Sequence, residues 1–450
     1  MNKKYDLVVV GGGIAGLAIG EIFARSGFKV ALLEKDDKLC MGDSGVHHEW
    51  FHFGSLYSIF PNNQFLRTLV GSIDDILVYY RDLEGMNLRV TSDGKLITVE
   101  NGCNWFREDT IEYVVAARND PDFELKKFSG IKDFLNKLIK LLYWERCIKQ
   151  FIARHNRFYS YDWRRGVASH YIPKAGLYDY SRVVISKFQD DKIRLDPDTH
   201  FRIKGYDKPM ISSNIITDLI RSLKSSGGDI FLNSRFIDYN NRSNGIEVVS
   251  ENGVLRTDKL ILALGKDLGG THQTESKIDV FVSPLLVVYP NVCDINFVRL
   301  TPFVTKTINH IKHSVEGKTY SLIGGGYFAS PEDPEEKERV QRYLVDRAKL
   351  VFPMIKEAKI LEVYFGNKTE VASSLKDIKK RNYLYRIERI DRDVYFVVPG
   401  KFSLGFSLAV NTFKELVGHY PNTYVIYDRN IDVEEYIGLM RHRSMVLNNS

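Results

Sequence analysis

The sequence predicts an α/β protein that opens with a β-α-β unit. Residues 7–10 form a short apolar run of one leucine and three valines, which is typical of a buried parallel strand. The glycine-rich stretch 11–16 follows at once, and residues 17–26 then have the character of a helix. Residues 28–33 form a second apolar strand that ends at Glu34. Strand, loop, helix and strand in this order make a β-α-β unit of ordinary length.

The rest of the chain mixes helical and strand patterns. Residues 88–99 are expected to form a hairpin, with its turn at Ser92-Asp93-Gly94. Apolar spacing predicts helices over 66–83, 131–152, 214–223, 335–351 and 406–417. Short apolar and β-branched runs predict strands over 230–232, 246–249, 259–264, 280–289, 320–323 and 394–398.

Composition places the chain among soluble globular proteins of two to four domain-sized units. It has 450 residues, of which 44% are hydrophobic and 27% are charged. No apolar run reaches the roughly 18 residues that a membrane span needs. The four cysteines include no Cys-x-x-Cys pair, so neither a zinc site nor a disulfide framework is expected. Such cysteine usage fits a reducing compartment, and we expect a cytoplasmic protein.

The net charge of +6 is concentrated in one segment. Residues 126–165 hold six Lys and five Arg against three acidic residues, a balance of +8, which leaves −2 for the rest of the chain. Within it, 131–152 is either a basic amphipathic helix on a membrane surface or a packed helix with solvated lysines. We expect the packed helix. Tyr159, Tyr161 and Trp163 could stack on nucleic-acid bases, but we expect no nucleic-acid partner.

The glycine loop has the chemistry of a dinucleotide site. Gly11 lets the chain turn sharply, Gly13 lets the backbone approach a pyrophosphate, and Gly16 lets the helix pack against the strand. The N-terminus of that helix offers free N–H groups and a partial positive charge to phosphates. Glu34, about 20 residues further on, is suited to accept hydrogen bonds from both ribose hydroxyls. Its negative charge would repel a 2′-phosphate, so NADP is not expected.

Three later segments distinguish FAD from NAD. Residues 258–265 end in Ala-Leu-Gly and resemble the strand that returns to the dinucleotide in FAD-dependent oxidoreductases, which usually ends in Ala-Thr-Gly. Residues 400–409 resemble the C-terminal flavin loop of the D-amino-acid oxidase superfamily, where Gly-His-Phe-Arg-Asn-Gly is common. Residues 44–57 resemble the segment that passes the flavin ring in glycine oxidase and L-2-hydroxyglutarate oxidase. The resemblance extends from residue 5 to 417, with poor matching over 80–205.

This resemblance implies a doubly wound, Rossmann-like FAD-binding domain with an inserted α+β substrate domain built on an antiparallel sheet. The FAD-binding domain would comprise residues 1–80, 206–272 and 376–430, the substrate domain residues 81–205 and 273–375, and a C-terminal extension residues 431–450. The flavin would lie at the join, with its oxygen-rich edge at the N-terminus of a helix that begins near Gly405. The residues expected to bind FAD are Gly11, Gly13, Ile14, Ala15, Gly16, Glu34, Lys35, Ser44, Gly45, Phe236, Ala263, Gly265, Gly400, Phe402, Ser403, Leu404 and Gly405.

The resemblance further implies oxidation of a CH–NH or CH–OH bond of a small polar metabolite by hydride transfer to the flavin. Oxygen, a quinone or a carrier protein would accept the electrons. His52, Lys368 and Lys401 are the candidate catalytic residues. Glycine-oxidase-like members hold a carboxylate with two arginines, and Lys368 and Ser403 stand at the matching positions here. Glycine, sarcosine and common D-amino acids are therefore expected to be poor substrates, and a larger metabolite would suit a pocket lined by 144–163.

The sequence is compatible with other functions of a flavin-binding chain. The flavin could serve a monooxygenase or a C=C reductase that uses NAD(P)H, although no second complete glycine loop is present. The chain could also be a flavin-binding partner subunit without turnover of its own. His47, His48 and His52 lie close in sequence, but the side chains of neighbours diverge, so no metal site is expected. His52 is expected to pack or hydrogen-bond beside the flavin, and covalent attachment of FAD through it is the less favoured reading.

Overall fold

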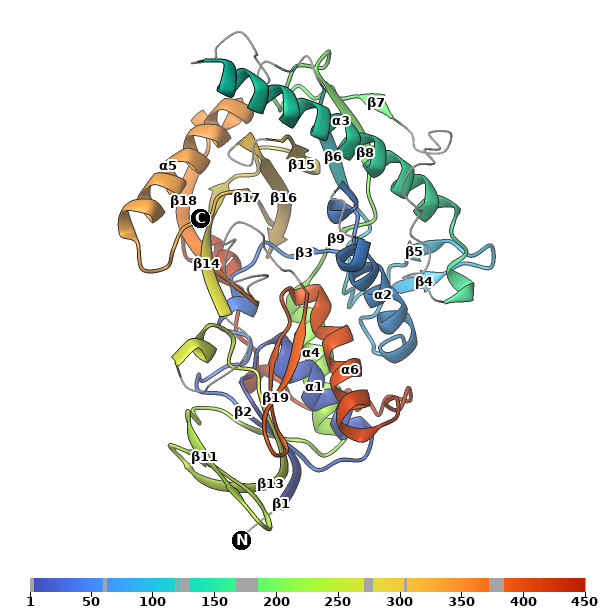
Figure 1. Cartoon of the computed structure of the whole chain (residues 1–450), viewed down its shortest axis with the longest axis vertical. Coiled ribbons are helices and arrows are strands. Elements are labelled where there is room, and N and C mark those ends of the chain that lie inside the picture. Colours follow the sequence, from blue (N-terminus) through green and yellow to red (C-terminus); the bar gives the residue numbers. More distant parts are fainter. Residues whose placement is uncertain are drawn as a thin grey trace.

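The computed structural model describes residues 4–59, 63–117, 120, 130–166, 185–270, 278–302, 306–371 and 384–449. These residues form two large sheets, each with helices packed against it (Figure 1). The first sheet lies in the lower half of Figure 1 and the second in the upper half. The predicted fold class is confirmed. In the ranges just given, no helix is both long enough and apolar enough to cross a membrane.

The first sheet is built on five parallel strands in the order β10-β2-β1-β13-β20. Antiparallel strands extend it, with β12 and β11 following β13, and β19 pairing β20. The bounds are β1 Lys4–Val10, β2 Val30–Leu33, β10 Asp229–Phe231, β11 Phe236–Arg242, β12 Gly245–Ser250, β13 Gly253–Leu262, β19 Arg386–Asp391 and β20 Val394–Val398.

Helices cover one face of this sheet. Leu7 and Val9 of β1 and Leu32 of β2 point into a core shared with the helices, while Val8 and Val10 point to a second core on the opposite face. This alternation is the period of two expected of a strand buried on both faces. The helices in the first core are α1 Ile14–Arg25, α2 Asn63–Tyr79, α4 Ser212–Ser225 and α6 Gly405–Val417.

The second sheet has the order β18-β14-β17-β16-β15-β6-β8-β7 and is antiparallel except between β15 and β6. The bounds are β6 Ile111–Ala116, β7 Ser186–Lys187, β8 His200–Lys204, β14 Ile278–Tyr289, β15 Asn296–Leu300, β16 Ile308–Val315, β17 Lys318–Gly325 and β18 Lys359–Val371.

Three helices pack on this second sheet. Helix α3 (Ile131–Ser160) covers the face formed by Tyr113 and Val115, and helix α5 (Pro334–Val351) covers the face to which Val114 points. The C-terminal helix α7 (Arg441–Asn449) packs against β14, β17 and β18, on the face opposite to α5. Two further antiparallel pairs are present among the described residues: a two-stranded sheet of β3 (Trp50–Phe51) with β9 (Lys208–Pro209), and a hairpin of β4 (Leu88–Val90) with β5 (Leu96–Thr98).

The structure corrects several predicted elements. Helix α2 spans Asn63–Tyr79 rather than 66–83, α3 continues to Ser160, and β13 begins at Gly253 rather than 259. Strand β11 was not predicted, because its sequence is largely polar and none of its side chains is fully buried. The domain boundaries stay a prediction, and those at 272/273 and 375/376 lie outside the described residues.

Candidate functional site

A cavity of about 410 Å³ lies at the carboxyl ends of the parallel strands of the first sheet. Val10, Leu33, Ala263 and Pro399, at or just beyond the ends of β1, β2, β13 and β20, all line it. Open α/β sheets bind ligands at this edge. Residues 367–370 of β18 line the cavity too, so it lies where the two sheets meet.

The structure brings most of the predicted site residues together around this cavity. The lining includes Gly11, Gly13, Ile14, Ala15, Glu34, Lys35, Ser44, His52, Phe236, Ala263, Gly265, Lys368, Gly400, Lys401 and Phe402. Five predicted residues do not line it: Gly16, Gly45, Ser403, Leu404 and Gly405. The predicted contribution of 144–163 is wrong for this cavity. Trp144, on α3, packs against the second sheet, Tyr161 and Trp163 are buried in the core of the first sheet, and the side chain of Tyr159 lies outside the described part.

Each glycine of the loop meets a different constraint. Gly11 has a φ of +104°, and a Cβ there would lie 2.4 Å from the carbonyl oxygen of Ala263. A Cβ on Gly16 would lie 1.9 Å from the carbonyl oxygen of Gly11, so this position keeps α1 close to β1. A Cβ on Gly13 would meet only Ser44 Oγ, at 3.3 Å. The fold therefore requires glycine at positions 11 and 16. Gly13 instead leaves open the space into which a phosphate would fit.

Glu34 stabilises the same loop by accepting backbone hydrogen bonds. One oxygen, Oε2, accepts the Gly12 N–H at 2.6 Å, and Oε1 accepts the Asp36 N–H at 3.0 Å. Burial raises the pKa of Glu34, although these backbone hydrogen bonds act in the opposite direction. A carboxylate has about four acceptor positions, so Glu34 retains capacity for ribose hydroxyls after making both bonds.

Side chains on both sides of the cavity connect separate segments. Ser44 Oγ accepts the Ile14 N–H at 3.0 Å, which caps the start of α1. Lys35 Nζ pairs with Asp267 Oδ2 at 2.6 Å and so joins the end of β2 to the turn after β13. Gly45 lies behind the lining, where a Cβ would approach the carbonyl oxygen of Cys40 to 2.4 Å.

The C-terminal loop brings a second helix start to the cavity. Gly400 has a φ of +67°, residues 402–404 form one 3-10 turn, and α6 begins at Gly405 as predicted. A Cβ on Gly405 would lie 3.1 Å from Ile14 Cγ1, so α1 and α6 begin side by side. The partial positive charges of both helix N-termini therefore lie close to this part of the cavity. Ser403 is buried, and no partner for its hydroxyl is found among the described residues.

Neutral imidazoles and two lysines line the other end of the cavity. Burial, together with the positive charges of Lys368 and Lys401, holds the pKa of His48 well below its usual range. Burial lowers the pKa of His52 to about 4, with Lys401 and Lys368 contributing, and lowers that of His47 to about 3. Lys401 Nζ lies 4.6 Å from the ring centre of Tyr57. Both lysines therefore sit beside histidines that are uncharged at neutral pH.

Asp207 positions this end of the cavity, and the sequence offered no signal for it. Its buried carboxylate accepts hydrogen bonds from a run of neighbouring residues and from the second sheet. The partners are Trp50 Nε1 at 3.2 Å, His52 Nδ1 at 3.4 Å, Phe53 N at 2.8 Å, Ser55 N at 3.0 Å, Leu56 N at 3.2 Å and the Tyr113 hydroxyl at 2.7 Å. These bonds outweigh burial and hold the pKa of Asp207 below its usual range. The carboxylate fixes the orientation of His52.

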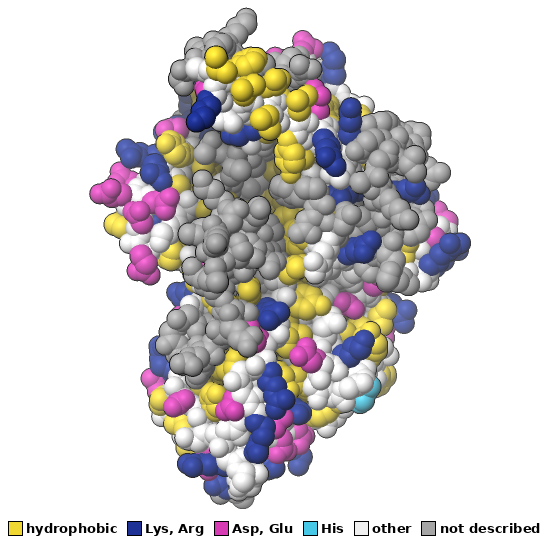
Figure 2. Space-filling model, in the orientation of Figure 1, with side chains coloured by type: hydrophobic (Ala, Val, Ile, Leu, Met, Phe, Trp, Pro, Cys, Tyr) yellow, Lys and Arg dark blue, Asp and Glu magenta, His cyan; other side chains and the backbone are white. Residues whose placement is uncertain are grey.

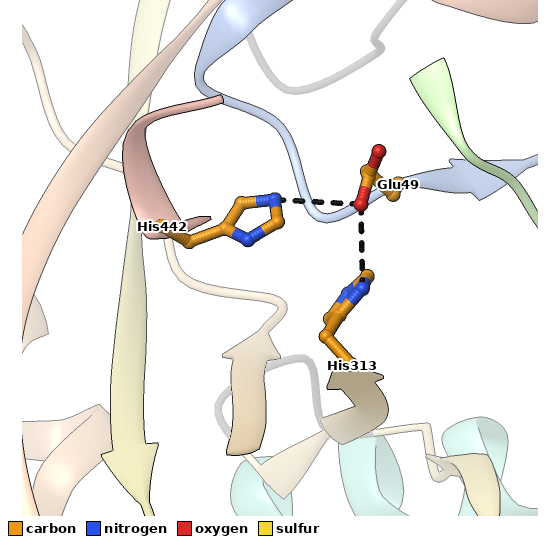
Figure 3. Close-up of side chains that lie close together, drawn as sticks. All are labelled: Glu49, His313 and His442. Atoms are coloured by element: carbon orange, nitrogen blue, oxygen red, sulfur yellow. Dashed lines mark ion pairs between the residues drawn. The ribbon is translucent and has the colours of Figure 1, made fainter. Parts of the chain in front are cut away.

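A second buried carboxylate, Glu49, connects three distant parts of the chain (Figure 3). Its Oε2 lies 3.3 Å from His313 Nδ1 of β16 and 3.7 Å from His442 Nε2 of α7, and it accepts a hydrogen bond from Arg443 at 2.9 Å. Its Oε1 accepts the N–H and hydroxyl of Ser212, at the first turn of α4. Glu49 itself has a φ of +53°, and the chain continues directly into β3.

Glu49, His313 and His442 could present three ligand atoms to a metal ion, since these atoms lie within 4.8 Å of one another. The Arg443 guanidinium already neutralises the carboxylate, on the same oxygen that faces both histidines. Burial holds the pKa of His313 well below its usual range and lowers that of His442 to about 4, so both are uncharged at neutral pH. The cluster is therefore a buried ion pair with two neutral imidazoles beside it.

Residues 6–126 match the family model described as FAD dependent oxidoreductase. A search of curated proteins finds no match. Solved structures with the same fold include L-α-glycerophosphate oxidase from Mycoplasma pneumoniae with FAD bound, which is 13% identical with a TM-score of 0.60 and covers 95% of this chain and 97% of its own.

Glycine oxidase from Geobacillus kaustophilus is similar as well, at 13% identity and a TM-score of 0.58, with 98% of this chain and 99% of that chain covered. L-proline dehydrogenase from P. horikoshii follows, at 14% identity and a TM-score of 0.56, with 93% and 94% covered. At these identities the likeness concerns the fold, and it extends over nearly the whole length of both chains.

Replacing Arg443 should destabilise the protein in a pH-dependent way. Arg443→Met leaves the Glu49 carboxylate buried without its cation, which costs about 3–5 kcal/mol of unfolding free energy near neutral pH. In the parent protein, burial raises the pKa of Glu49, but the guanidinium reverses this and holds it well below the usual range. Without Arg443 the carboxyl takes up a proton in mild acid, so the difference in stability should shrink as pH falls from 7 towards 4.

Arg441→Met, on the same helix, is the matched control for denaturant unfolding measured at several pH values. Its guanidinium pairs with Glu362 at 2.6 Å on the surface, and such pairs contribute about 0–1 kcal/mol. Equal losses from the two variants would contradict the role of the buried pair.

Proposed function

We propose that this chain, whose residues 6–126 match the FAD dependent oxidoreductase family model, is an FAD-dependent oxidoreductase of the D-amino-acid oxidase superfamily. In this proposal it oxidises a CH–OH or CH–NH bond of a small anionic metabolite by hydride transfer to the flavin. The observation that carries the proposal is one cavity with two chemically different ends. The glycine loop, Glu34 and the start of α1 lie at one end, and His52 with Lys368 and Lys401 lies at the other.

The residues of the first end fit the pyrophosphate and ribose of FAD. Gly13 leaves space beside the α1 N-terminus, and Glu34 presents a buried carboxylate 22 residues after Gly12. The starts of α1 and α6 would hold negative charge on the phosphates and on the flavin edge respectively. When bound, FAD supplies the acceptor for a hydride leaving the substrate carbon.

His52 is proposed as the proton acceptor. His52 Nδ1 lies 3.4 Å from Asp207 Oδ2, a carboxylate oxygen that can only accept. With its hydrogen on Nδ1, His52 would present the lone pair of Nε2 to the proton of a substrate O–H or N–H. The C–H bond then breaks with its electron pair, the O–H or N–H proton passes to His52, and a C=O or C=N bond forms. Asp207 stabilises the resulting imidazolium and does not itself need to change protonation.

Lys368 and Lys401 favour an anionic substrate. Both lie close enough to His48 and His52 to lower the pKa of these imidazoles, so two positive charges lie at this end of the cavity. A lysine binds carboxylate or phosphate as a point charge and lacks the planar fork of arginine. A substrate held in this way needs further polar groups to fix its orientation. Oxygen, a quinone or a carrier protein is proposed as the electron acceptor.

Variants of two glycines in the loop can test cofactor binding separately from folding. Gly13→Leu should give a folded protein without FAD, because the new side chain would enter the cavity, where only Ser44 Oγ lies within 4 Å of its Cβ. Flavin absorbance and thermal melting measure the two properties. Gly16→Ala is the contrasting control, since its Cβ would lie 1.9 Å from the Gly11 carbonyl oxygen and should lower the melting temperature itself. Full FAD occupancy in Gly13→Leu would refute the assigned role.

Glu34→Gln should weaken FAD binding by tenfold or more. The substitution keeps the size of the side chain but removes the charge, and a hydrogen bond to a charged group contributes about 1.5–3 kcal/mol. Fluorescence titration of the apoprotein with FAD gives the dissociation constant. Asp258→Asn, an exposed acid paired with Lys4 at 2.5 Å, is the control and should bind FAD as the parent does. An unchanged constant in Glu34→Gln would remove this residue from the site.

Anaerobic mixing with a substrate panel tests the reaction. Hydroxy acids and organic phosphates with a secondary alcohol should reduce the flavin rapidly, while glycine, sarcosine and D-alanine should reduce it slowly. His52→Gln should slow reduction by a factor of about 10²–10⁴ without abolishing substrate binding. Because the base must be uncharged, the rate should fall as pH drops through the His52 pKa of about 4.

Lys368→Met should differ from His52→Gln. It should raise the substrate concentration at which flavin reduction reaches half of its maximal rate. Rapid bleaching by a simple amino acid, or an unaffected rate in His52→Gln, would each contradict the proposal. Reduction by NADH instead of any panel member would favour a monooxygenase or a C=C reductase.

A further inference from the structure

Helix α3 has two apolar faces. Leu141, Trp144, Phe151 and Ile152 are buried against the second sheet, as the sequence led us to expect of a packed helix. The outward face of the same helix is apolar as well. Its exposed side chains, with their exposed fractions, are Ile131 79%, Leu135 47%, Ile139 63%, Leu142 57% and Tyr143 51%. Steps of three and four residues place them along one stripe of the helix.

Basic residues accompany this stripe. Lys132, Lys140, Arg146 and Lys149 are all exposed, and Arg146 and Lys149 continue the line of the stripe towards the C-terminal half of the helix. The helix has two acidic residues against seven basic ones. Asp133 is partly buried and pairs with Lys137 at 3.3 Å, and Glu145 is partly buried too. Figure 2 shows the result along the top of the molecule, where hydrophobic side chains gather over α3 with Lys and Arg beside them.

We propose that the outward face of α3 docks this protein onto an anionic membrane surface. An apolar stripe flanked by lysines and arginines is the pattern of helices that lie in the plane of the lipid headgroups. The stripe would enter the boundary between headgroups and acyl chains, and the basic side chains would contact the headgroup phosphates. The helix would lie on the bilayer without crossing it, in agreement with its charge content.

The positive charge of the outward face of α3 favours a membrane over a second copy of this chain as its binding partner. A symmetric dimer through this face would set Lys132, Lys140, Arg146 and Lys149 of one copy near the same residues of the other. No exposed acid on α3 is available to offset that repulsion. Anionic lipid supplies both the apolar surface and the negative charge. The first sheet, at the opposite end of the molecule in Figure 1, would then face away from the bilayer.

Vesicle flotation of the flavin-loaded protein tests the proposal independently of its reaction. The protein should float with vesicles of mixed phosphatidylcholine and phosphatidylglycerol at low salt, and binding should weaken at high salt. Vesicles of phosphatidylcholine alone should bind it at least tenfold more weakly. Binding that ignores lipid charge, or no binding to the anionic vesicles, would overturn the proposal.

Two variants of α3 separate the apolar and the electrostatic contributions. Leu135→Ser combined with Ile139→Ser should reduce vesicle binding at least tenfold at any salt concentration, and Arg146→Glu combined with Lys149→Glu should abolish the preference for anionic lipid. The matched control is Tyr343→Ser with Leu350→Ser, two exposed residues of α5 at 49% and 59% exposure, which should bind as the parent does.

An unchanged flavin spectrum establishes that each variant is folded. Equal binding by the parent and the α3 variants would place the membrane contact elsewhere and overturn the proposal. Analytical ultracentrifugation provides a second test. If the parent forms a stable dimer and the variant with Leu135→Ser and Ile139→Ser is a monomer, the proposal is overturned, because the face would then bind a second copy.

Discussion

The end of the cavity that carries His52 depends on the hydrogen bonds made by the buried carboxylate of Asp207. Three backbone N–H groups between residues 53 and 56 converge on it, and so do side chains from β3 and from the second sheet. A charge in such a position is stable only while these donors surround it. The segment that carries His52 is consequently held in one conformation between the two sheets, and the role proposed for His52 as a proton acceptor requires that rigidity.

Glu49 fulfils a similar role a few residues earlier, with different partners. Its carboxylate joins the first turn of α4 to β16 and to α7, so the first sheet's helices and the second sheet's strands meet on one side chain. Trp50 and His52 thus lie close to two buried acids. The charge of Glu49 is compensated by the Arg443 guanidinium, and that of Asp207 mainly by N–H and O–H donors. Between them they fix the position of the histidines relative to the glycine loop, which the first sheet holds independently.

Local sequence predicted the parts of the site that are local in the chain. The β-α-β unit and the loop before α6 each lie within a few tens of residues, and Gly11, where a sharp turn was predicted, has a positive φ. Asp207 and the partners of Glu49 were not predicted, because their contacts join residues 94 to 394 positions apart and lack a spacing rule. The periodicity of α3 predicted a helix, but it did not tell which of its two apolar faces would be buried.

The order of the cavity lining along the chain has a consequence for biosynthesis. Residues near 11, 44, 236, 265, 368 and 402 all contribute, and Arg443 neutralises Glu49 from the last helix. During translation the ribosome therefore releases the last of these residues long after the first. The nascent chain has no finished cofactor site to offer before that moment, and its hydrophobic strands must wait for partners made much later. A complete lining with its supporting ion pair accordingly exists only after Arg443 has been synthesised.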